Sequence, residues 1–174
     1  MPQLFMVYLG GHAGQCHIEV HDVRFVIGEQ IEDTYPELIQ QWYGDKSGLH
    51  LDSYHIVDTV LGSDGKTYQV NVSQQPAADT AMKLYFVNMG GYHPDQMAEQ
   101  HAFSLFACRD EIQAKQMARQ RLLTHSQHPH KDNLHAVDNC LAIRLLDSWH
   151  IHLTVSPKPV KAIKPDWFGY EVIG

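Results

Sequence analysis

The stretch Leu4-Phe-Met-Val-Tyr-Leu-Gly-Gly11 occurs a second time, 80 residues further on, as Leu84-Tyr-Phe-Val-Asn-Met-Gly-Gly91. Three further correspondences follow in the same order: Glu19-Val-His21 with Glu99-Gln-His101, Leu49-His50 with Leu134-His135, and Tyr68–Ser73 with Ile151–Ser156. A repeat that keeps its order in this way is typical of a duplicated structural unit. The sequence therefore predicts a first copy at residues 1–73, a linker at 74–82, a second copy at 83–156 and a tail at 157–174 that contains proline, lysine and aromatic residues.

Each copy shows the same order of predicted elements. An apolar strand comes first, an alternating strand follows, then an amphipathic helix, and finally two strands, at 51–61 and 68–73 or at 136–146 and 151–156. Asp110 and Gln113 form a capping pattern at the start of the second helix. We therefore predict an α+β fold of two ββαββ units, with antiparallel hairpins and one helix against each sheet. Because one such unit has only a marginal core, the two are expected to pack together as a pseudo-dimer.

The composition is that of an acidic, histidine-rich globular chain. Its 174 residues include 13 Lys and Arg, 20 Asp and Glu and 13 His, which gives a formal net charge of −7. An acidic chain lacks the basic surface that binds nucleic acid, so no nucleic-acid partner is expected. The longest apolar run, Leu4 to Leu9, is far shorter than a membrane span, and the three cysteines form no Cys-x-x-Cys pair. We expect a cytoplasmic protein with no membrane partner, which could assemble into a homo-oligomer.

Several motifs of the first copy resemble a known family. Leu4–Gly11, the Glu-x-His-Asp sequence at 19–22, Phe-Val-Ile-Gly at 25–28, Ile-Glu-Asp-Thr-Tyr-Pro at 31–36 and Leu-His-Leu-Asp-Ser at 49–53 are similar to a small bacterial family known as domain of unknown function 1543. The second copy matches more weakly and has Ala102 where the first has Asp22. The resemblance implies one or two copies of the domain per chain. It implies no activity, because the family has none assigned.

The polar residues repeated in both copies are a glutamate and two histidines. They are Glu19, His21 and His50 in the first copy, and Glu99, His101 and His135 in the second. In a strand, Glu-x-His places both side chains on one face. Two histidines and one carboxylate form the ligand set of many open sites for divalent transition metals. The alternative is structural, in which the glutamate and histidine hydrogen-bond each other at the edge of the core.

The paired glycines at the end of each first strand are candidates for ligand binding. Gly10 and Gly11, and likewise Gly90 and Gly91, could form a backbone nest for a phosphate or carboxylate group. However, phosphate loops lead directly into a helix, whereas here the chain returns as a strand. The second interpretation is that these glycines only turn a hairpin.

The sequence contains no recognisable combination of nucleophile and base. It lacks Gly-x-Ser-x-Gly, His-Glu-x-x-His and a phosphate-binding lysine motif. The favoured function is therefore a non-catalytic module that binds a small molecule or a protein, with a pocket expected between the two copies. The alternative is a metal-dependent enzyme with a Glu/His/His site in each half. The sequence leaves open whether the chain is an enzyme and which ligand it takes.

Overall fold

The computed structural model describes residues 1–174 apart from 77–80, 93, 123–134, 144 and 147, and only the backbone of 135–139 and 145. The fold is mostly β, with two sheets, two α-helices and a short 3-10 helix, which agrees with the expected α+β class. The first half contains β1 (Gln3–Gly11), β2 (Val20–Gly28), η1 (Ile31–Thr34), α1 (Tyr35–Gln41), β3 (His50–Ile56), β4 (Thr59–Gly62) and β5 (Thr67–Ser73). The second half contains β6 (Lys83–Gly91), β7 (Gln100–Cys108), α2 (Glu111–Arg121), β8 (His135–Ile143), β9 (Leu145–Leu146) and β10 (Trp149–Ser156), and the tail adds β11 (Trp167–Val172).

The third strand of the repeat differs from the prediction. The single strand expected at 51–61 is two strands, β3 and β4, because the chain leaves one sheet and enters the other between Ile56 and Thr59. Val57 still donates its backbone N–H to the Leu4 carbonyl, at 2.9 Å, whereas Asp58 already accepts from the N–H of Val70 in β5, at 2.8 Å. The strand expected at 136–146 is likewise divided into β8 and β9.

This crossover carries the β4–β5 hairpin of the first half into the sheet of the second. The four-stranded sheet has the order β11-β3-β1-β2, and the seven-stranded sheet the order β8-β6-β7-β4-β5-β10-β9. Within the larger sheet, β4 pairs in parallel with β7, and β5 pairs antiparallel with β10. The two halves therefore share one continuous sheet.

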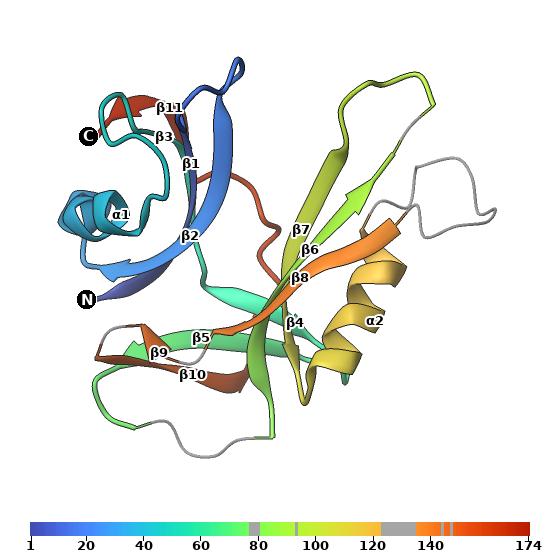
Figure 1. Ribbon diagram of the computed structural model, residues 1–174. Coiled ribbons are helices and arrows are strands. Elements are labelled where there is room, and N and C mark those ends of the chain that lie inside the picture. Colours follow the sequence, from blue (N-terminus) through green and yellow to red (C-terminus); the bar gives the residue numbers. More distant parts are fainter. Residues whose placement is uncertain (77–80, 93, 123–134, 144, 147) are drawn as a thin grey trace.

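The largest core also draws on both halves. The apolar faces of both sheets contribute its buried residues: Leu4, Met6, Phe25, Val57, Val60, Tyr68, Val70, Met82, Leu84, Phe86, Leu105, Ala107, Ile143, Ile151 and Leu153. Each helix covers the opposite face of its own half, α1 on the four-stranded sheet and α2 on β6, β7 and β8 (Figure 1). The α2 helix begins as predicted, because the Asp110 side chain accepts a hydrogen bond from the Gln113 backbone N–H at 2.8 Å.

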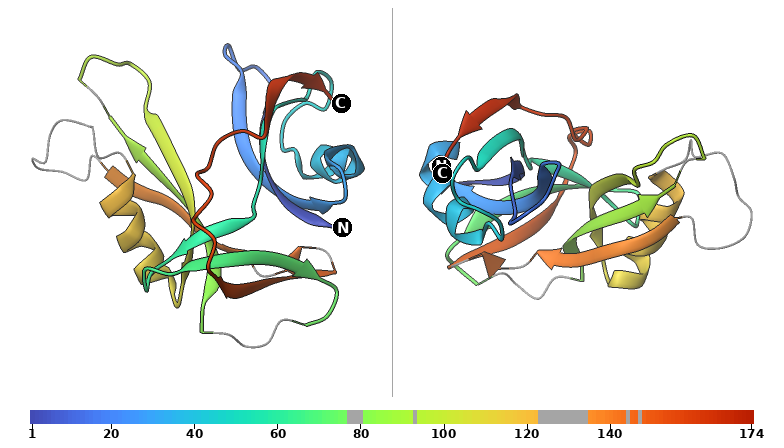
Figure 2. Two further views of the ribbon diagram at one scale, coloured as in Figure 1. Left: turned by 180° about the vertical axis from the view of Figure 1, so that it is seen from behind. Right: turned by 45° about the horizontal axis from the view of Figure 1, so that its top comes forward.

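The tail returns to the first half. From β10 it passes between the two halves and then joins the four-stranded sheet as β11, antiparallel to β3 (Figure 2). Both termini consequently lie on the first half. Among the helices in the described part of the chain, none combines the length and the apolar character that a membrane crossing needs.

The shared core makes a prediction about stability. Leu153 in β10 pairs with Val70 and is 8% exposed. Leu153→Ala should lower the free energy of unfolding by about 2–4 kcal/mol, because it removes buried methyl groups and leaves a cavity. Urea denaturation followed by circular dichroism measures the change. Leu141→Ala, at a strand position that is 50% exposed, is the matched control and should cost less than about 1 kcal/mol. Equal losses in the two variants would contradict the shared core.

Candidate functional site

Four polar side chains surround the end of β1. Gly10 is the centre of this group, since the strand register pairs it with His21 of β2 on one side and with His50 of β3 on the other. Residues two apart in a strand share a face, so Glu19 joins His21 and Asp52 joins His50. The structure thus brings together the three residues predicted for the first copy and adds Asp52.

The four side chains form a closed ring of histidines and carboxylates. His50 Nε2 lies 3.1 Å from a Glu19 oxygen and 3.4 Å from an Asp52 oxygen. His21 Nε2 lies 3.5 Å and 3.4 Å from the other oxygen of each of these carboxylates. The side chains of Glu19 and His21 are both 36% exposed and that of Asp52 is 26% exposed, so one side of the ring faces solvent.

His50 is the buried member of the ring. Its side chain is 1% exposed, and its Nδ1 lies 2.9 Å from the Gly48 carbonyl oxygen. A ring nitrogen facing a carbonyl must carry the proton and donate it, so Nε2 is the nitrogen directed into the cluster. Although two carboxylates lie within ion-pair distance, neither is in the direction for a hydrogen bond, and Nε2 is buried without a hydrogen-bond partner.

Two tyrosines pack on the histidine rings. Tyr170 of β11 lies against His50, with ring centroids 4.1 Å apart, and Tyr8 of β1 stacks on His21 at 5.3 Å. Burial, and then the nearby carboxylates of Asp52 and Asp22, raise the pKa of the Tyr8 hydroxyl above its ordinary value. Tyr8 therefore stays protonated beside the ring of acceptors.

The paired glycines belong to the strands and not to the turns that follow them. Gly10 and Gly11 lie inside β1, and Gly90 and Gly91 inside β6, so none of them turns a hairpin. Gly10 is paired with strands on both sides, which takes up the backbone groups that a nest would need. Its function is steric, because a Cβ at this position would lie 2.5 Å from His50 Nε2 and 2.9 Å from an Asp52 oxygen.

The described residues of the second half show one part of the ring. Glu99 and His101 are adjacent, with Nε2 and a carboxylate oxygen 3.8 Å apart. However, the register pairs Gly90 with Ala136, whereas its counterpart Gly10 pairs with His50. The Leu-His correspondence in the sequence is therefore one residue out of register, and His135, whose side chain lies outside the described residues, is opposite Gly91.

Asp52 is the member of the site that the sequence prediction missed. The signal was present, since His50-Leu-Asp52 has the same two-residue spacing as Glu19-Val-His21.

As the side chains stand, no group of three or more His, Cys, Asp and Glu in the described part of the chain is gathered closely enough to hold a metal ion.

A cavity of about 350 Å³ lies between the two halves. Its lining comes from β1, β2 and β3, from β7 of the second half and from the tail: Met6, Val7, Tyr8, Val23, Ser53, Tyr54, His55, Phe103, Ile163, Lys164 and Pro165. The Tyr8 ring stacks on Phe103 at 6.1 Å as well as on His21. Tyr8 therefore separates the cavity from the histidine–carboxylate ring and contacts both.

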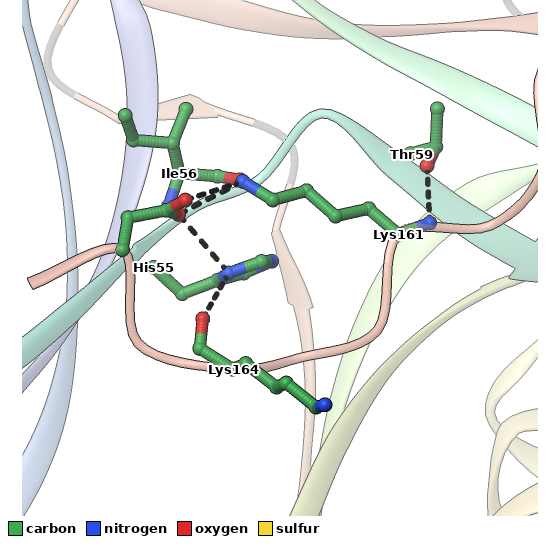
Figure 3. Close-up of polar contacts among 6 residues, drawn as sticks. His55, Ile56, Thr59, Lys161 and Lys164 are labelled. Atoms are coloured by element: carbon green, nitrogen blue, oxygen red, sulfur yellow. Dashed lines mark hydrogen bonds and ion pairs between the residues drawn. The ribbon is translucent and has the colours of Figure 1, made fainter.

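Polar contacts with β3 and β4 hold the tail in place (Figure 3). Lys161 Nζ donates to the Asp166 carboxylate at 2.8 and 2.9 Å, and the same carboxylate accepts from the Ile56 backbone N–H at 2.7 Å. His55 is buried beneath this pair and donates from Nδ1 to the Lys164 carbonyl at 2.8 Å. The wall of the cavity at 163–165 is therefore fixed on both sides.

Two of these groups have shifted pKa values. Burial lowers the pKa of His55, against the opposing effect of its hydrogen bond to the Lys164 carbonyl. Burial alone would raise the pKa of Asp166, but the hydrogen bonds from Lys161 and the Ile56 N–H outweigh it and hold that pKa below its ordinary value. His55 is therefore neutral and Asp166 is charged in the folded protein at neutral pH.

Comparison with known proteins gives a family match and a similar fold. The family model described as Domain of Unknown Function (DUF1543) matches residues 16–72 and again residues 96–152. The crystal structure of a protein Il1583 from Idiomarina loihiensis is similar over 100% of this chain and 99% of that one, with 30% sequence identity and a TM-score of 0.75. No curated protein matches the chain.

The lowered pKa of His55 makes the stability depend on pH. Below about pH 6.5 the unfolded chain binds a proton at His55 that the folded chain does not, so unfolding becomes easier as the pH falls. His55→Gln should remove this part of the dependence. Between pH 7.5 and 5.5 the wild type should therefore lose more unfolding free energy than the variant does. The extra loss should be up to about 1.4 kcal/mol per pH unit. Urea titrations across this range measure it, with the exposed His17→Gln as a control, and parallel curves for His55→Gln and wild type would contradict it.

Proposed function

The chain belongs to the family described as Domain of Unknown Function (DUF1543), with one match in each half, and from this premise we propose that the two copies together form a binding module for a small organic molecule. The observation that carries the proposal is the cavity between them. Its volume of about 350 Å³ falls within the usual range for small-molecule sites, about 300–1,000 Å³.

The proposal includes the arrangement of the two copies, 1–73 and 83–156, as a pseudo-dimer of ββαββ units whose third strand is broken. The β5–β10 register supports it. Val70 pairs with Leu153, which is its own counterpart in the repeat at an offset of 83 residues, so a pseudo-twofold axis would pass through this pair. The core supports it as well, because counterparts such as Leu4 and Leu84, or Phe25 and Leu105, are buried together.

The walls of the cavity indicate the kind of ligand. Val23 and Phe103 are counterparts in the two copies and both line it, whereas Tyr8 has Asn88 as its counterpart. The two sides of the cavity are therefore not equivalent, and they favour an asymmetric molecule. Most of the lining is apolar or aromatic, so the ligand would bury chiefly apolar surface, with Ser53 and the tail backbone available for a polar group.

Binding without catalysis is the assignment that these side chains support. In the described lining, His55 is engaged by the Lys164 carbonyl and by Asp166, which lies 3.3 Å from Nδ1. Ser53 and Tyr8 also line the cavity and carry hydroxyl groups. In the described contacts, neither hydroxyl is hydrogen-bonded to His55. A nucleophile activated by a general base needs such a contact.

The proposal can be tested by filling the cavity. The fluorescent probe 8-anilinonaphthalene-1-sulfonate is an aromatic anion that suits a mainly apolar site. It should bind the wild-type protein with one site, and Val23→Trp should weaken that binding at least about tenfold, since the indole would occupy the space. Val155→Trp, at a strand position that is 61% exposed, is the matched control and should bind as wild type does. Unchanged binding in a folded Val23→Trp variant would contradict the proposal.

A further inference from the structure

We propose that Glu19, His21, His50 and Asp52 bind one divalent transition-metal ion, and that this site exists in the first half alone. The proposal concerns the histidine–carboxylate ring and is independent of the ligand in the cavity. It rests on three features: the buried nitrogen of His50, the close approach of His50 and Asp52 to Gly10, and the set of donor atoms.

The first feature is the unpartnered nitrogen. With the His50 proton on Nδ1, Nε2 carries a lone pair and lies 3.1 and 3.4 Å from oxygens of two carboxylates, so all three groups are acceptors. Acceptors held together in this way repel one another unless a cation lies among them. Leaving a buried polar atom without a partner is also costly, and such atoms are rare in folded proteins. A bound metal ion would satisfy the nitrogen and both carboxylates together.

The second feature is the close approach of His50 and Asp52 to Gly10. A Cβ there would lie 2.5 Å from His50 Nε2, 3.0 Å from its Cε1 and 2.9 Å from an Asp52 oxygen. These distances show that the His50 imidazole and the Asp52 carboxylate lie directly against the backbone at position 10. Glycine at this position is therefore what allows the donor atoms of His50 and Asp52 to be gathered at the end of β1, where the proposed ion would bind them.

The third feature is the spacing and chemistry of the donors. The four nitrogen–oxygen distances of the ring are 3.1, 3.4, 3.5 and 3.4 Å. Two ligands bound at about 2.1 Å to one ion, at near-tetrahedral or octahedral angles, are separated by roughly 3.0–3.4 Å. Only a small movement would be needed to close the ring on an ion, and the side chains of Glu19 and His21 are exposed enough to make it.

The donor set selects the class of metal. Two imidazoles with two carboxylates suit zinc, manganese, iron or cobalt, whereas calcium and magnesium prefer oxygen donors throughout. The Gly48 carbonyl, which accepts the Nδ1 proton of His50, is the kind of outer contact that orients histidine ligands toward a metal. In the second half Ala136 occupies the register position of His50, so an alanine stands where the first half has its imidazole.

The competing interpretation is that a protonated histidine simply joins the two carboxylates. Metal titration separates the two. Full-length protein without an affinity tag, stripped of metal, is titrated with Co²⁺ by calorimetry and by visible absorption, which reports nitrogen and oxygen coordination. We expect one equivalent, and His21→Phe should weaken binding at least about tenfold while keeping an aromatic ring on Tyr8. His101→Phe is the matched control in the second half and should bind as wild type does.

A second variant keeps all four donors. Gly10→Ala should also weaken Co²⁺ binding, because its methyl group would collide with the His50 ring and the Asp52 carboxylate and displace both donors. The sequence offers another source of weak metal binding, the histidines at 125, 128 and 130, so a variant with all three changed to glutamine is titrated as well. Loss of the Co²⁺ site in that variant, its persistence in a folded His21→Phe variant, or the absence of any Co²⁺ binding by the wild type would each overturn the proposal.

Discussion

The antiparallel pairing of β5 with β10 is the interaction on which the rest of the structure depends. Each half taken alone has one helix and a few strands, a size at which a single core gives little stability. The strand pair joins the halves into one sheet and brings their apolar faces into one core, where Val70 and Leu153 meet. The helices then need to cover only the outer faces, which is what α1 and α2 do.

This pairing also determines where the cavity forms. To reach β10, the β4–β5 hairpin must leave the sheet of its own half, and the chain does so between Ile56 and Thr59. Beyond this crossover the four-stranded sheet and β7 face each other across the seam, and the tail runs along it, held by Lys161 and Asp166. The cavity therefore lies along this seam, where Phe103 of the second half and the tail segment at 163–165 complete a lining that comes mainly from the first half.

Much of this architecture was predictable from the sequence, because the repeat and the alternation within strands are local patterns. The family match confirms the duplication, and the Asp110 cap was correct. The break within the third strand and the counterpart of His50 were not predictable. Strand register depends on the partner strand, and here both copies have a register shift, between Tyr8 and Leu9 and between Asn88 and Met89. Matching Leu-His to Leu-His placed His135 one residue away from the position that pairs with Gly90.

The difference between the halves follows from what each position has to do. Core positions must match in volume and polarity on both sides of the seam, so the two copies have apolar residues at each of them, as in Leu4 and Leu84. The positions around Gly10 lie at the end of the sheet and outside the core that the two halves share, so matching across the seam places no such demand on them. There the first copy has His50 and Tyr8 and the second has Ala136 and Asn88. A buried, unpartnered histidine nitrogen costs stability, so a residue such as alanine would be the cheaper choice at position 50 if packing alone decided it. The proposed metal ion would supply the partner that this nitrogen lacks, and it would account for a histidine at a position where the second half has alanine.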